Sequence, residues 1–210
     1  MWYYVKQAIV PFFYLIFGTV IALGILVLGD DLIWLKILLL ILNVGLYLFI
    51  VGAASFKDGE AALKVRVAND LERWNIIRTG EDRPLKLKEE FKLWKGFMPG
   101  LIACIPLVVL ILVHLLINIG GGNHMQAAGI ANLLYMTFSG FAHVNSAANV
   151  ASWAVYLNLI ALIIIPGTTG LMYYLGGRKV ELQQQMIEEK KRQIYGDNYE
   201  KNNAHSWWKV

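Results

Sequence analysis

The chain alternates between long apolar stretches and shorter polar ones. Four apolar stretches of about twenty residues stand out, at about 8–28, 32–55, 97–119 and 153–175. A helix rising ~1.5 Å per residue needs about 20 such residues to cross a hydrocarbon core of ~30 Å. A soluble core would instead show apolar residues at helical or strand spacing. The pattern therefore predicts an all-α, multi-pass membrane protein with four transmembrane helices.

The first two stretches predict a transmembrane hairpin over residues 1–55. Gly29, Asp30 and Asp31 supply the turn between them. The first stretch is too long for the apolar core of a secretory signal peptide, and no small-x-small cleavage site precedes the turn. We therefore expect it to be retained as a helix. Near the start of the second stretch, Lys36 is expected to extend its ammonium group to the membrane interface.

A charged loop over residues 56–95 follows the hairpin. It holds ten of the nineteen Lys and Arg residues and eight of the fifteen Asp and Glu residues. Its first part repeats apolar side chains at three- and four-residue spacing, which predicts an amphipathic helix that could continue from the second span. Its last part sets basic residues against aromatic ones, which is typical of a helix along the membrane surface, although a merely solvated face has the same pattern. The expected partner or lipid surface comprises Leu63, Val67, Leu71, Trp74, Lys88, Phe91, Lys92, Trp94 and Lys95.

The third span (96–120) and the fourth (153–176) both contain proline, at Pro106 and at Pro166. An internal proline lacks the N–H of a helical hydrogen bond, so both spans are expected to kink. Three spans also carry a polar side chain that needs a partner in the membrane. These intramembrane candidates are Asn43, His114 and Asn158.

Residues 121–152 contain no Lys, Arg, Asp or Glu. The segment is too short and too polar for a full crossing of the membrane, which favours a cap over the helices or a re-entrant helix on the extracytoplasmic side. A fifth crossing is the alternative, and it would place the basic tail opposite the charged loop. The tail itself, residues 177–210, predicts a cytoplasmic helix to about Tyr195 and disorder beyond it.

Basic residues gather on one side of the predicted spans. The charged loop has ten Lys and Arg residues and the tail from Arg178 has seven, whereas residues 120–152 have none. Because short loops rich in Lys and Arg stay in the cytoplasm, both termini are expected there, with the protein in the cell membrane.

Composition narrows the possible functions. The chain is 57% hydrophobic and 16% charged, and its net charge of +4 comes from residues that flank the spans. This placement favours contact with lipid head groups over nucleic acid. The only cysteine, Cys104, cannot form an intramolecular disulfide, and no sequence motif indicates a cofactor. Asp58 and Gly59 resemble the start of the CDP-alcohol phosphotransferase signature, but its arginine and further aspartates are missing, which excludes that activity.

Three functional hypotheses remain open. The first is a non-enzymatic accessory or scaffold subunit that docks a protein partner through the charged loop and tail. The second is a small transporter or channel subunit, working as a homo-oligomer, with a polar path near Asn43, His114 and Asn158. The third is a membrane metalloenzyme, which requires His114, His124 and His143 to converge near the outer face.

Overall fold

The computed structural model describes residues 2–28, 30–80, 91–120, 125–144 and 154–195. These residues form helices and connecting turns, and no strand occurs among them. Four of the helices are long and apolar enough to cross a membrane, so the predicted all-α, multi-pass class is confirmed. The helices are α1 (Trp2–Leu26), α2 (Ile33–Thr79), α3 (Leu93–Ile119), α4 (Met125–Leu134), α5 (Met136–Ser139), α6 (Ala154–Leu157) and α7 (Leu159–Tyr195), with 3₁₀ turns at Asp30–Leu32 and Gly140–His143.

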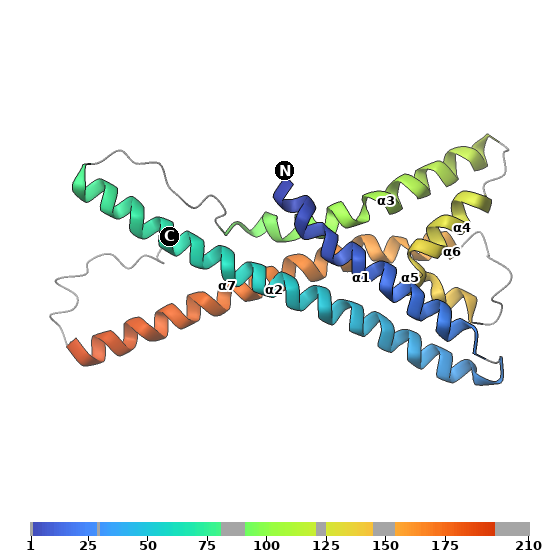
Figure 1. The fold of residues 1–210 in the computed structure, drawn as a ribbon, viewed down its shortest axis with the longest axis horizontal. Helices are drawn as coiled ribbons and strands as arrows, with labels where there is room; N and C mark the ends of the chain where they lie inside the picture. The colour runs from blue at the N-terminus through green and yellow to red at the C-terminus, as the bar shows by residue number, and fades with distance from the viewer. Residues whose placement is uncertain (1, 29, 81–90, 121–124, 145–153, 196–210) are drawn as a thin grey trace.

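Two long helices, α2 and α7, cross one another and set the shape of the molecule (Figure 1). They contain 47 and 37 residues, which at ~1.5 Å per residue makes them about 70 and 55 Å long. Both are therefore much longer than the ~30 Å that a hydrocarbon core requires. The second apolar stretch, from Ile33, and the first part of the charged loop form one uninterrupted helix. The fourth stretch is interrupted at Asn158, and only its part from Leu159 continues into the tail as one helix.

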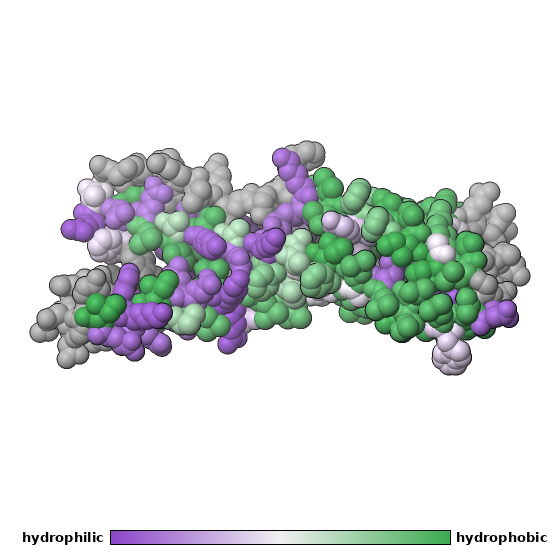
Figure 2. All heavy atoms as spheres, turned by 60° about the horizontal axis from the view of Figure 1, so that its bottom comes forward, coloured by the Kyte–Doolittle hydropathy of each residue, from purple (hydrophilic) through white to green (hydrophobic). Residues whose placement is uncertain are grey.

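Past the crossing, the two helices diverge as the α2 arm (57–79) and the α7 arm (177–195). The α2 arm ends at Gly80, whose φ of 68° is left-handed and whose N–H caps the carbonyl of Ile76. Glycine adopts this conformation without strain, which explains the helix end. Figure 2 shows hydrophilic residues gathered over the arms and hydrophobic residues over the remainder, which we call the apolar body.

Glycines bring α2 and α7 into backbone contact at the crossing. A Cβ atom on Gly59 would overlap with the carbonyl oxygen of Tyr173, and one on Gly176 would overlap with that of Phe56. Small residues allow helix backbones to approach closely in membranes, where packing rather than the hydrophobic effect drives association. The position of the crossing is therefore fixed by these two glycines.

The third helix packs on α7 by the same means. A Cβ on Gly96 would lie 2.7 Å from that of Tyr173, and one on Gly100 would lie 2.6 Å from the Cα of Pro166. In return, Gly170 of α7 receives the ring of Phe97. Helix α7 is thus in close contact with both α2 and α3.

The small helices α4, α5 and α6 pack together at the end of the apolar body remote from the arms (Figure 1). Tyr135, between α4 and α5, is fully buried and donates a hydrogen bond of 3.0 Å to the carbonyl of Ala103. The neighbouring carbonyl, that of Ile102, would normally accept a hydrogen bond from the N–H of residue 106. That bond is absent because residue 106 is proline. Lys36 is only 2% exposed, so it does not extend to the surface as expected.

Candidate binding surfaces and buried polar groups

The α2 arm exposes large apolar side chains outside the apolar body. Leu71 is 46% exposed and Ile77 is 80% exposed, while the Arg78 guanidinium lies 5.4 Å from the ring centre of Trp74, itself 37% exposed. Leu63 and Val67, which the sequence places on the same stripe, are half-buried and face α7. The predicted stripe is thus divided between an inner pair and an outer, exposed part.

The α7 arm exposes a second apolar set. Figure 2 shows hydrophobic residues that interrupt the hydrophilic surface of the arms. Within the apolar body such exposure is explained by contact with lipid, whereas on an arm it makes a candidate interaction surface. The residues are Leu182, Met186, Ile187 and Ile194, exposed by 49, 53, 53 and 74%.

The residues that lead into α3 also include both packed and exposed side chains. The ring of Phe91 stacks on that of Tyr173 with 5.0 Å between centroids and 5° between planes, so it is a packing residue. Trp94 is 53% exposed and its ring lies 5.9 Å from that of Tyr4. Lys92 is exposed and Lys95 is half-buried, whereas Lys88 lies outside the described residues.

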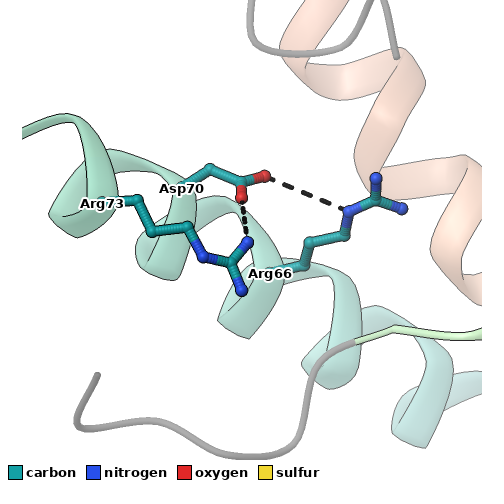
Figure 3. Close-up of polar contacts among 3 residues, drawn as sticks. All are labelled: Arg66, Asp70 and Arg73. Atoms are coloured by element: carbon teal, nitrogen blue, oxygen red, sulfur yellow. Dashed lines mark hydrogen bonds and ion pairs between the residues drawn. The ribbon is translucent and has the colours of Figure 1, made fainter. Parts of the chain in front are cut away.

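A cavity of about 120 Å³ lies between the diverging arms, and we call it the crossing cavity. Asp70 forms one side, where its carboxylate lies between two arginines of its own helix (Figure 3): 2.8 Å from Arg73 Nη1 and 4.0 Å from Arg66 Nε. Across the cavity, Arg178 Nη1 donates a hydrogen bond of 3.2 Å to the Tyr174 hydroxyl. The lining comprises Leu63, Arg66, Val67 and Asp70 of α2, Phe91, and Tyr174, Gly177, Arg178, Glu181 and Gln184 of α7.

An ion pair joins the two arms just past the crossing. Lys179 of α7 pairs with Glu60 of α2, and its ammonium lies 5.4 Å from the ring centre of Phe56. The hydrogen bond from Lys179 lowers the pKa of Glu60, and the positive charges of Lys179, Lys64 and Lys57 act in the same direction. Two residues earlier on the same helix, burial raises the pKa of Asp58.

The first intramembrane candidate, Asn43, holds α1 to α2. Its side-chain amide donates a buried hydrogen bond of 2.9 Å to the carbonyl of Gly18. The cavity beside it measures only about 10 Å³, which is at the lower limit for a single water molecule, about 10–15 Å³. This geometry is that of a bond between helices.

The other two candidates lie in the end of the apolar body that contains α4 to α6. Asn158 donates a hydrogen bond of 3.0 Å to the Asn132 side chain, and both residues are at most 1% exposed. The ring of His114 lies 6.0 Å from that of Tyr156 in an edge-on arrangement. The contacts of Asn43 and Asn158 therefore involve different helices and different partners.

The metal hypothesis involves His143, which is 3% exposed, and His114, which is 2% exposed. Its third member, His124, lies outside the described residues. Among the residues that are described, no group of three His, Cys, Asp or Glu side chains is placed to hold a metal ion.

Comparison of the chain with known protein families, curated proteins and solved structures found no match. The candidate sites consequently depend on geometry alone. Sequence reasoning did not single out Asn132 or the crossing cavity. The cavity has a recognisable signal in retrospect, because Arg66 and Arg178 each lie about one helical turn before an acid, Asp70 or Glu181, on the same helix.

Proposed function

We propose that this chain is a non-enzymatic membrane protein that docks a protein partner through its α2 and α7 arms. The observation that supports this proposal is that the arms expose large apolar side chains, above all Ile77, which is 80% exposed, and Ile194, which is 74% exposed. Outside a bilayer, apolar groups of this size gain ~25 cal/mol for each Å² that a partner removes from water.

The spacing of these residues suits a helical partner. Leu71, Trp74 and Ile77 recur at every third position of the α2 arm, and Ile187 and Ile194 lie seven residues apart on the α7 arm. Such stripes are the surface against which an amphipathic helix packs. The basic residues of the charged loop and tail support a cytoplasmic position for both arms.

Affinity purification of the full chain from a mild detergent tests the proposal. The wild type is expected to retain a protein at a fixed molar ratio, whereas Ile77→Glu and Ile187→Glu are expected to lose it. Asn75→Glu is the matched control, because it adds the same charge to an exposed position of the α2 arm without removing an apolar side chain. Recovery of the chain alone, or only as a homo-oligomer, would refute the docking function.

A further inference from the structure

The charged side chains of the crossing cavity follow the same order on both helices. On α2, Arg66 lies one helical turn before Asp70, and on α7, Arg178 lies one turn before Glu181; all four line the cavity. Both helices run from the apolar body into their arms (Figure 1). Each arginine is therefore closer to the apolar body than the acid on its own helix.

The end of the cavity nearest the apolar body is aromatic and apolar. Phe91, stacked on Tyr173, lies against Gly177, where a Cβ atom would overlap with its ring. Tyr174 and Leu63 complete this end of the lining. Aromatic side chains with a polar tip are enriched at the head-group level of a bilayer, and the apolar stretch of α7 ends here, at Leu175.

The existing contacts of the arginines lie within their own helices. Arg178 donates to Tyr174, and Arg66 lies 4.0 Å from Asp70, which is beyond hydrogen-bonding distance. Asp70 instead receives its short contact, 2.8 Å, from Arg73. The two guanidinium groups thus border a space of about 120 Å³, several times the ~10–15 Å³ that one water requires.

We propose that the crossing cavity binds the head group of a membrane phospholipid that carries a primary amine. The phosphate lies between Arg66 and Arg178, because guanidinium groups match phosphate oxygens with paired, charge-assisted hydrogen bonds. The ammonium group lies further from the bilayer than the phosphate and donates hydrogen bonds to Glu181 and Asp70. The acyl chains lie along the apolar body. A soluble phosphate ester of ethanolamine has the same polar groups, but it does not use the aromatic end of the cavity.

Native mass spectrometry of the purified full chain tests this site, with phosphatidylethanolamine, phosphatidylglycerol and phosphatidylcholine of identical acyl chains added in turn. Phosphatidylethanolamine is expected to bind most tightly. Arg178→Gln is expected to weaken both phosphatidylethanolamine and phosphatidylglycerol by roughly ten-fold, the typical effect of losing one charge-assisted hydrogen bond. Glu181→Gln is expected to weaken phosphatidylethanolamine alone. Lys64→Gln, an exposed change of the same charge outside the lining, is the control.

Two further measurements make the outcome decisive. Val67→Phe keeps every charge but fills part of the cavity, and it is expected to reduce phosphatidylethanolamine binding about as much as Arg178→Gln. Equal binding of the three lipids, or variants indistinguishable from Lys64→Gln, would overturn the proposal. Free phosphoethanolamine that binds as tightly as the lipid would overturn the assignment to a membrane lipid.

Discussion

Replacing Gly59 by alanine should separate the two long helices. The added methyl group would overlap with the carbonyl oxygen of Tyr173, and it would lie 2.8 Å from the carbonyl carbon and 3.0 Å from the Cα of that residue. Backbone atoms cannot rotate away as the end of a side chain can. The helices must therefore move apart over the crossing, and the contact of Gly176 with Phe56 is weakened at the same time.

The expected magnitude follows from two opposing terms. Overpacking of a tight contact costs about 1–3 kcal/mol, while alanine is about 1 kcal/mol better than glycine inside a helix. Gly45→Ala isolates the second term, because Gly45 lies on the same helix and a Cβ there meets no atom within 4 Å. Gly59→Ala should therefore be less stable than Gly45→Ala by about 1–3 kcal/mol.

Cys104 provides the assay. It is the only cysteine and is 2% exposed, so a thiol-reactive fluorophore reports unfolding on heating. With roughly 2–4 °C in Tm per kcal/mol for a chain of this length, a difference of about 2 kcal/mol lowers the Tm of Gly59→Ala by roughly 4–8 °C relative to Gly45→Ala. Equal Tm values for the two variants would refute the proposed backbone contact.

Two further predictions use the same assay. Asn158→Leu removes the donor to the buried Asn132 side chain and should destabilise the protein by about 1–2 kcal/mol. A double variant with Asn132→Leu should recover part of this loss. If the destabilising effects of the two single variants simply add, the pairing of the two side chains is wrong. Because the pKa of Glu60 is lower in the folded state than in the unfolded state, its stabilisation is present above its unfolded pKa and is lost as the pH falls through its folded pKa. The Tm difference between the wild type and Glu60→Gln should therefore shrink on acidification, and a difference that is independent of pH contradicts the ion pair with Lys179.

The number and positions of the long helices could be predicted from the sequence because hydrophobic length is a local property. A stretch such as 97–119 must be helical in a bilayer, since each backbone N–H and C=O group needs a partner within its own segment. The sequence alone does not decide whether α2 continues through Ser55 into the charged loop, because the polar residues there permit either a turn or a helix. No glycine or proline breaks the chain between Gly59 and Gly80, which is consistent with the unbroken helix.

The pairing of residues between helices could not be predicted in this way. Gly18 and Ala22 have the small-residue spacing of a contact face, but only the fold shows that Gly59 and Gly176 make the closest contact. The burial of Lys36 was missed for the same reason, because its surroundings are set by neighbouring helices. A polar residue in a span indicates that a partner exists, but its identity, as with Asn132 for Asn158, depends on the tertiary arrangement.

The two proposals concern different parts of the same helices, so they can be tested separately. Ile77 and Ile187 lie beyond the crossing cavity, and Arg178 lies within it. If lipid binding and partner docking are independent, Arg178→Gln should retain the partner and Ile77→Glu should retain the lipid. If the head group sets the separation of the arms, each ligand must change the affinity for the other by the same factor, because such coupling is reciprocal. Partner affinity measured with and without phosphatidylethanolamine distinguishes the two cases, and a change in only one direction is thermodynamically excluded.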